Sequence, residues 1–334
     1  MEALILITIL ISFFITYLAL PFWIRKAKQI GLLWQDMHKN HIQNKIAGSG
    51  GVVVVTGLIF GILMYIALKV FYFNTMDNLV EMLSMIVSIL LVSGIALIDD
   101  LFGWQRGGLS KRTRLILVLF AAIPLMVINV GESSMILPFF GLTELGILFP
   151  LLIVPIGIVG ATTTFNFLAG YNGLESSQGI LILIGLAITT YLTGHTWLSV
   201  ICIYGVTVLL AFYIFNFHPA RVFPGDVLTY AIGAMIAIIS ILGNIEKIAI
   251  IFFMPYIAET ILKLRGGLEK PSFGKINEDG SLSAPFKKSY SLTHLAIRIL
   301  QKIKPNKKVY EREVVWFINI VQIIFIILGL AQLI

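Results

Sequence analysis

Long apolar runs separated by polar segments dominate the chain. An α-helix of about 20 residues crosses a hydrocarbon core of about 30 Å, and the runs have about that length. They predict about ten membrane spans, at residues 3–22, 51–73, 79–98, 113–131, 146–165, 178–194, 196–215, 226–243, 246–263 and 314–333. Prolines and glycines inside the fifth span predict a kink there. We therefore expect an all-α polytopic membrane protein, with one integral membrane domain over residues 1–334.

The composition supports this class. The chain is 58% hydrophobic and 12% charged, and its mean hydropathy is +0.96. A water-soluble domain does not need so much apolar surface. Cys202 is the single cysteine and lies in an apolar run, which excludes a disulfide within the chain and favours a small buried side chain. No basic residue precedes the first run, so we interpret it as a span and not a signal peptide.

Basic residues gather in the loops that follow odd-numbered spans. Of the 24 lysines and arginines, only Lys69 and Lys247 fall on the other side. Cytoplasmic loops of membrane proteins carry an excess of Lys and Arg. The distribution therefore predicts that the odd-numbered loops are cytoplasmic and that both termini lie outside.

Three of these predicted cytoplasmic loops carry unusual polar residues. In the first of the three, Asp99 and Asp100 directly follow an uncharged run. In the second, residues 166–175 contain two asparagines and a glutamate, and in the third, residues 219–226 end in Asp226. Carboxylates at membrane depth are costly unless a partner compensates them. Oxygen ligands suit a hard cation such as Mg²⁺, and Mg²⁺ together with basic residues suits a phosphorylated substrate.

Each element also has a purely structural interpretation. Asp99 and Asp100 could cap a helix end, and Asn172 with its following glycine could form a turn. Arg221 could anchor the chain at the membrane surface, and Asp226 could be the N-cap of the eighth span. The five histidines lack metal-site spacing on a helix, and we interpret them as surface or interfacial residues.

The last predicted cytoplasmic segment, about 264–313, is a long insertion. Asp279-Gly280 between short strand-like pieces predicts a hairpin. Residues 292–303 predict an amphipathic helix with Leu295, Ile299 and Ile303 on one face. This helix could lie at the membrane interface or pack against the protein.

The three polar motifs together resemble the polyprenyl-phosphate N-acetylhexosamine-1-phosphate transferase family. They read Ile98-Asp99-Asp100, Asn-Phe-Leu-Ala-Gly-Tyr-Asn-Gly-Leu-Glu over 166–175 and Pro-Ala-Arg-Val-Phe-Pro-Gly-Asp over 219–226. The second motif is similar to the branch that uses UDP-N-acetylglucosamine (UDP-GlcNAc) and dolichyl phosphate. The resemblance covers nearly the whole chain and points to the archaeal type.

This resemblance implies a reaction. The phosphate of a membrane polyprenol attacks the β-phosphorus of UDP-GlcNAc, giving polyprenyl-diphosphate-GlcNAc and UMP as the first membrane step of glycan assembly. The implied partners are both substrates and the lipid bilayer, with no nucleic acid; a homodimer stays open. The implied location is a plasma membrane with a cytoplasmic site, or the endoplasmic reticulum membrane in a eukaryote.

The resemblance also implies roles for residues on the nucleotide side. Asp226 and Asn166 would hold Mg²⁺, with Mn²⁺ as an alternative. Phe223 would stack on uracil, Asn172 would hydrogen-bond the uridine part, and Arg221 is a further substrate-binding candidate.

On the acceptor side, Asp99 and Asp100 would lie beside the lipid phosphate, with Lys111 as its cationic contact. Lys39 in the first loop is a second candidate for that role. Arg265 alone stands where the dolichol branch often has a histidine-arginine cluster, which makes it the candidate sugar contact.

The competing interpretation is a membrane transporter of a phosphorylated or anionic solute. Carboxylates at the membrane midplane and inverted repeats are typical of transporters. Here the acids lie at span exits on one predicted side and no inverted repeat is visible, which favours the transferase.

Overall fold

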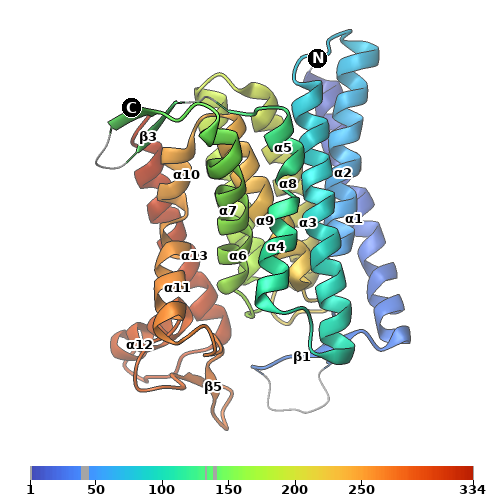
Figure 1. The fold of residues 1–334 in the computed structure, drawn as a ribbon. Helices are drawn as coiled ribbons and strands as arrows, with labels where there is room; N and C mark the ends of the chain where they lie inside the picture. Colours follow the sequence, from blue (N-terminus) through green and yellow to red (C-terminus); the bar gives the residue numbers. More distant parts are fainter. Residues whose placement is uncertain (1, 39–44, 132–133, 138–140, 334) are drawn as a thin grey trace.

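The computed structural model describes residues 2–38, 45–131, 134–137 and 141–333 as a bundle of long helices (Figure 1). Both termini lie at one end of the bundle, opposite α12 and β5. Eight helical segments in the described part are long and apolar enough to cross a membrane. They are α1 (Glu2–Ile30), α2 (Gly51–Ala67, continued by the π-helix η1, Leu68–Tyr72), α3 (Leu79–Arg106), α6 (Val154–Phe167, preceded by the π-helix η2, Phe149–Ile153), α7 (Leu174–Leu192), α8 (Thr196–Asn216), α9 (Gly225–Leu242) and α13 (Glu311–Leu330).

The other two predicted spans are each divided into two short helices. Residues 113–131 contain α4 (Lys111–Phe120) and α5 (Ile123–Val127), and residues 246–263 contain α10 (Glu246–Phe252) and α11 (Met254–Arg265). Both α5 and α11 begin with a proline in the first two positions. Proline lacks a backbone N–H and clashes with the preceding turn, so the helix restarts there. The all-α polytopic fold is confirmed, whereas a count of ten spans is not.

The fifth predicted span begins with irregular helix geometry, because the π-helix η2 precedes α6 there; the kink itself stays a prediction. The predicted hairpin is also present, as β5 (Lys275–Ile276) pairs antiparallel with β6 (Leu282–Ser283). Two further antiparallel hairpins were not predicted. They are formed by β1 (Leu33–Gln35) with β2 (Lys45–Ala47), and by β3 (Ser134–Leu137) with β4 (Gly141–Glu144).

The predicted amphipathic helix is α12 (Leu292–Ile303), and its buried face differs from the expected one. Ala296 and Ile297 are completely buried, whereas Ile303 is 69% exposed. Because α12 packs against α11 and α13, the packing interpretation holds for its inner face. The predicted stripe through Ile299 and Ile303 faces outward.

The centre of the bundle is α9, which packs against α2, α3, α6 and α7. Nearly all of its residues between Val227 and Ile241 are buried. Its N-terminal end therefore lies among the ends of neighbouring helices. This arrangement brings Asp226 next to the two aspartates of α3.

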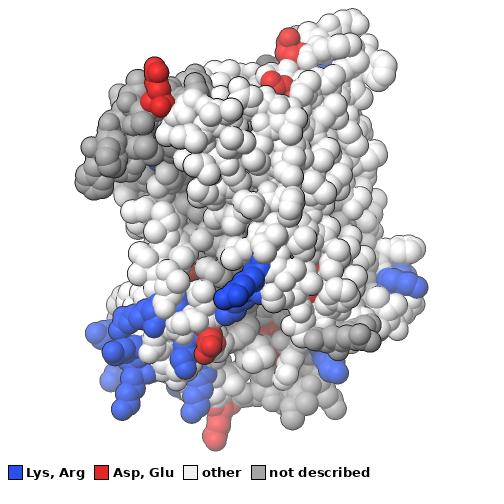
Figure 2. Space-filling model, in the orientation of Figure 1, with Lys and Arg blue, Asp and Glu red and all other residues white. Residues whose placement is uncertain are grey.

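The charged surface is uneven. In the face shown in Figure 2, lysines and arginines gather at the end of the bundle that carries α12 and β5, whereas acidic residues are visible at both ends. The polar motifs lie toward the basic end. The orientation of that end to the cytoplasm stays a prediction.

Candidate active site

The two adjacent aspartates lie inside α3 and not at its end. Asp99 and Asp100 are each 7% exposed, and α3 continues to Arg106 with Gly107 as its C-cap. The interpretation of this pair as a cap of its own helix is therefore wrong. Buried carboxylates need partners, and each of the two has a different set.

Asp100 holds the start of α9. Its Oδ1 accepts a hydrogen bond from the backbone N–H of Asp226 at 2.9 Å, and its Oδ2 accepts one from the Ser49 hydroxyl at 2.8 Å. Gly225 has a φ of +68°, and a Cβ there would overlap the Asp100 carboxylate. The first-turn N–H groups of a helix lack partners within the helix and favour negative charge, so Asp100 stabilises this terminus.

Asp226 itself lies in the first turn of α9. The N-cap is Pro224, so the predicted N-cap role of Asp226 is wrong. The backbone N–H of Asp226 is bound by Asp100, so the Asp226 carboxylate is not needed to cap α9 and can contact another group.

Arg114 joins the two sides of the carboxylate cluster. Its Nη1 lies 2.8 Å from Asp99 Oδ2 and 3.2 Å from Asp226 Oδ2. The second Asp99 oxygen, Oδ1, accepts a hydrogen bond from the N–H of Leu109 at 2.5 Å. We call Asp99, Asp100, Asp226 and Arg114 the carboxylate cluster.

The cation in this cluster is not the one predicted. Lys111 is exposed at the start of α4, and its ammonium donates to the carbonyl of Leu268 at 3.2 Å. Arg114, three residues later on α4, makes the carboxylate contacts instead. From the sequence it was only one of four basic residues in a loop. The N-cap Ser110 starts α4 one turn before Arg114, but the contacts to Asp99 and Asp226 follow only from the fold.

A cavity of about 410 Å³ opens beside the cluster. The predicted residues Asn166, Phe223 and Asp226 all line it. Thr229 links two of them, since its hydroxyl donates to Asn166 Oδ1 at 3.0 Å. The remaining lining residues include Trp34, Met37, Tyr171, Glu175 and Phe273.

The donor set of this cavity fits a divalent cation. Among the described residues of the cluster, three carboxylates face a single guanidinium, so negative charge is in excess. Asp226 and Asn166 add hard oxygen donors on one cavity wall. Magnesium prefers such oxygen ligands and keeps several waters or phosphate oxygens of its own.

Several other predicted residues do not line the cavity. Asn172 is 3% exposed and does not line it. Arg221 and Arg265 are exposed, and neither lines it. Lys39 lies outside the described residues.

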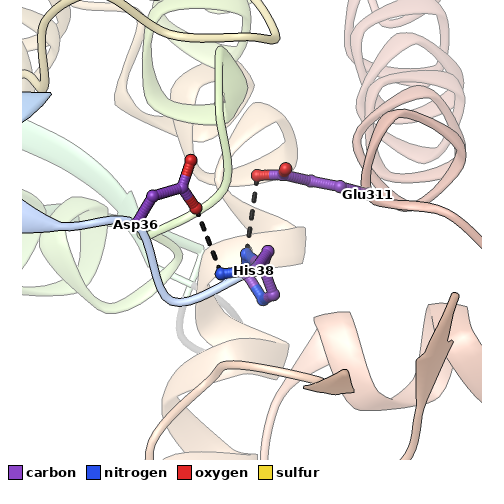
Figure 3. A group of neighbouring side chains, drawn as sticks. All are labelled: Asp36, His38 and Glu311. Atoms are coloured by element: carbon purple, nitrogen blue, oxygen red, sulfur yellow. Dashed lines mark hydrogen bonds and ion pairs between the residues drawn. The ribbon is translucent and has the colours of Figure 1, made fainter. Parts of the chain in front are cut away.

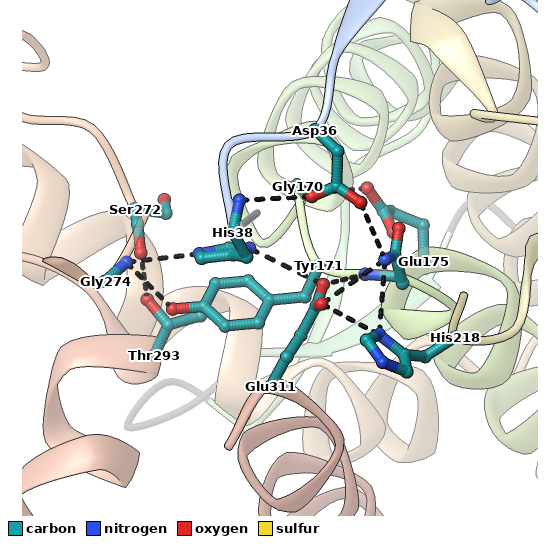
Figure 4. Close-up of polar contacts among 11 residues, drawn as sticks. Asp36, His38, Gly170, Tyr171, Glu175, His218, Ser272, Gly274, Thr293 and Glu311 are labelled. Carbon is teal, nitrogen blue, oxygen red and sulfur yellow. Dashed lines mark hydrogen bonds and ion pairs between the residues drawn. The ribbon is translucent and has the colours of Figure 1, made fainter. Parts of the chain in front are cut away.

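A second polar cluster, which the sequence did not reveal, surrounds Glu311 (Figure 4). This residue is the first of α13 and is 6% exposed. Its carboxylate accepts the backbone N–H of Asn172 at 2.7 Å and lies 3.0 Å from Nδ1 of His218. His38 is also buried, at 6% exposure. The surface interpretation of the histidines is wrong for His38 and for His294, which is 1% exposed.

In Figure 3, Asp36, His38 and Glu311 converge from the segment after β1 and from the start of α13. One ligand atom from each residue lies within 4.8 Å of the others. Such spacing is compatible with either a metal ion or a hydrogen-bonded network.

Comparison with known proteins adds a family to this geometry. Residues 82–244 match glycosyl transferase family 4. The matched region contains the whole carboxylate cluster together with Asn166, whereas Glu311 lies outside it.

Relatives of this chain match over most of its length. A protein of Saccharolobus solfataricus is 36% identical over 88% of both chains. One of Sulfolobus acidocaldarius is 31% identical over 98% of this chain and 95% of its own. Both carry the provisional name UDP-N-acetylglucosamine–dolichyl-phosphate N-acetylglucosaminephosphotransferase. The phospho-N-acetylmuramoyl-pentapeptide-transferase of Streptococcus thermophilus is 30% identical over 75% of both chains.

Proposed function

The chain belongs to glycosyl transferase family 4, and we propose that it transfers N-acetylglucosamine 1-phosphate from UDP-GlcNAc to a polyprenyl phosphate such as dolichyl phosphate. The names of the two archaeal relatives support these substrates. One structural observation carries the proposal: Asp226, Asn166 and Phe223 line one cavity, and Arg114 connects that cavity to Asp99. We place the site on the cytoplasmic face of the cell membrane.

The cavity would bind the nucleotide sugar. Phe223 offers an aromatic side chain for the uracil base. Asp226 and Asn166 would hold Mg²⁺, which when bound neutralises charge on the diphosphate. Thr229 orients Asn166, because its hydroxyl is bonded to the amide oxygen.

The acceptor phosphate would lie near Asp99 and Arg114. Arg114 shares one nitrogen between two carboxylates, so its other guanidinium donors can address a phosphate. Lys111 lies one turn away on α4 and adds a second cation on this side. Because the protein is predicted to span the membrane, the lipid chain of the acceptor would reach this site directly from the bilayer.

In the proposed reaction, an oxygen of the lipid phosphate attacks the β-phosphorus. A P–O bond forms there, and the bond from that phosphorus to the oxygen of the α-phosphate breaks, so that UMP leaves with the oxygen. The second pKa of a phosphate monoester is near 6, so the nucleophile is already mostly ionised at neutral pH. Phosphoryl transfer then needs positioning and charge neutralisation more than a strong base.

The test is UMP release by the purified protein from UDP-GlcNAc, with and without polyprenyl phosphate and Mg²⁺. We expect release only when both are present. A panel of UDP-sugars in the same assay identifies the preferred sugar. If no nucleotide sugar gives UMP while an anionic solute crosses proteoliposomes containing the protein, the transporter interpretation replaces this proposal.

A further inference from the structure

The Glu311 carboxylate lies where four segments of the chain meet, and the reaction proposed above does not use it. His38 comes from the segment after β1, Asn172 from the loop between α6 and α7, and His218 from the loop between α8 and α9. Glu311 begins α13, the last long helix. A buried carboxylate that collects contacts from so many segments fixes their relative positions.

The contacts to Glu311 are all from groups that can donate. Oε1 accepts the Asn172 N–H at 2.7 Å, and Oε2 lies 3.3 Å from Asn172 Nδ2. Nδ1 of His38 and Nδ1 of His218 lie 3.5 Å and 3.0 Å from the two oxygens. Among these described contacts no Lys or Arg takes part. The Glu311 carboxylate is therefore contacted by a backbone amide, a side-chain amide and two histidines.

These contacts also fix the orientation of the Asn172 amide. Its Nδ2 lies 3.2 Å from Asp36 Oδ2 and 3.3 Å from Glu311 Oε2. Carboxylates only accept hydrogen bonds, so the NH₂ group must face them and the carbonyl oxygen must face away. Glu311 and Asp36 thus fix the orientation of the buried Asn172 side chain, and with it the loop that borders the cavity.

A metal ion is the alternative explanation of this cluster, and one hydrogen bond argues against it. Nδ1 of His38 and Oε1 of Glu311 are 3.5 Å apart, close to the separation of two ligands on one zinc ion with bonds of about 2.0–2.1 Å. However, the N–H of Gly274 donates to Nε2 of His38 at 3.3 Å. A neutral His38 that accepts this bond carries its proton on Nδ1, toward Glu311, where a metal would need a lone pair. The same N–H also donates to the Tyr171 hydroxyl at 3.1 Å, so Zn²⁺ binding is the test between the two explanations.

The loop held by Glu311 forms one wall of the cavity. Gly170, Tyr171 and Glu175 line the cavity on either side of Asn172. The Tyr171 ring packs on the His38 ring with centroids 4.2 Å apart, and its hydroxyl accepts the Gly274 N–H at 3.1 Å. This wall belongs to the nucleotide side, and in the described part of the chain Glu311 makes no hydrogen bond or ion pair with Asp99 or Arg114.

We propose that Glu311 is a positioning residue for the nucleotide-sugar half of the active site, acting through Asn172 and the loop that carries it. The proposal rests on the transferase function proposed above. It predicts a defect in nucleotide binding that leaves the lipid half of the site intact.

The decisive variant is Glu311→Gln, which keeps the shape of the side chain but removes its charge and one acceptor. We expect UDP-GlcNAc, titrated by calorimetry with Mg²⁺ and no acceptor, to bind about ten-fold more weakly. The KM for polyprenyl phosphate should stay unchanged. Glu313→Gln is the matched control, since Glu313 lies in the same helical turn and contacts Lys304 instead; it should bind like wild type.

Three results would overturn the proposal. The first is wild-type affinity for UDP-GlcNAc in Glu311→Gln, and the second is an equal rise in the KM of both substrates, which would mark a general structural role. Binding of Zn²⁺ alone that raises the unfolding temperature of wild type but not of Glu311→Gln would identify a metal centre and also overturn it. Wild type is included throughout. If wild type itself neither binds UDP-GlcNAc nor releases UMP, the proposed function fails as well.

A second pair keeps the test valid if Glu311→Gln does not fold. His218 lies on the same carboxylate with a side chain 26% exposed, so substitutions there should be tolerated. Asn places its amide nitrogen near the position of the imidazole Nδ1. His218→Asn should therefore retain nucleotide affinity while His218→Leu weakens it, and equal affinity in the two variants would contradict the proposal.

Discussion

Arg114→Gln removes the guanidinium that Asp99 and Asp226 share. The two contacts, 2.8 Å and 3.2 Å long, are each worth about 5–6 kcal/mol at an effective dielectric constant near 20, before desolvation is subtracted. Removing one partner of a buried pair costs about 3–5 kcal/mol. Arg114 and Asp226 are both 26% exposed while Asp99 is 8% exposed, so the lower part of that range applies.

That cost falls on the stability of the fold. In the proposed reaction Arg114 also stabilises charge at the acceptor phosphate, so we expect its removal to cost about 3 kcal/mol of transition-state stabilisation, or roughly a hundred-fold in kcat/KM. The assay is UMP release at saturating Mg²⁺. Arg114→Lys keeps the charge but not the planar fork, and should lose about ten-fold. Arg112→Gln is the matched control, because Arg112 is an exposed residue on the same helix, and it should match wild type.

Mg²⁺ binding to the carboxylate cluster gives a second readout that does not depend on turnover. Without Arg114, Asp99 and Asp226 attract a divalent cation more strongly. Mg²⁺ should then raise the unfolding temperature of Arg114→Gln more than that of wild type. A folded Arg114→Gln enzyme with wild-type kcat/KM, or with a smaller Mg²⁺ shift than wild type, would refute this account of the cluster.

Three further substitutions test other parts of the molecule. Asp226→Ala should reduce UMP release to background, since losing a metal ligand costs several kcal/mol of transition-state stabilisation; wild-type release would exclude the metal assignment. Thr229→Val removes the hydrogen bond to Asn166 and should raise the Mg²⁺ concentration needed for half-maximal rate, without changing the rate at saturation. Burial lowers the pKa of His294 to about 4 from its ordinary 6.5, so the unfolded chain binds the extra proton between these values and stability should fall as pH drops through that window. His294→Asn should flatten this dependence in unfolding curves followed by tryptophan fluorescence, and an unchanged slope would show that another group causes it.

The apolar pattern was sufficient to predict most of the fold because it reports directly on burial in lipid. Eight of the predicted spans occur as long helices. The two divided ones contain Pro124 and Pro255 near the start of their second helices. Hydrophobicity does not depend on the backbone hydrogen bond that proline removes. The apolar pattern therefore predicted one continuous span at each of the two places where the helix is interrupted.

Site residues were predicted correctly where a polar residue directly borders an apolar span. Asp226 and Asn166 attracted notice because they border apolar spans, and both line the cavity. Arg114 and Glu311 did not, because a basic residue in a predicted cytoplasmic loop and an acid at the start of a helix are ordinary. Their roles arise from partners 112 and 139 residues away along the chain, which no local pattern encodes.

The neighbouring aspartates illustrate what only the three-dimensional arrangement could supply. Side by side in sequence they seemed to present one problem, the compensation of two crowded charges. On a helix, adjacent residues point in directions about 100° apart. Asp100 therefore faces the backbone of α9 and Ser49, while Asp99 faces Arg114. Both oxygens of Asp100 accept hydrogen bonds from the protein, which favours a role in holding Asp226 in place. Of the two, only Asp99 contacts Arg114 in the described part of the chain, and Arg114 lies on the proposed acceptor side. We therefore assign the role in positioning the lipid phosphate to Asp99.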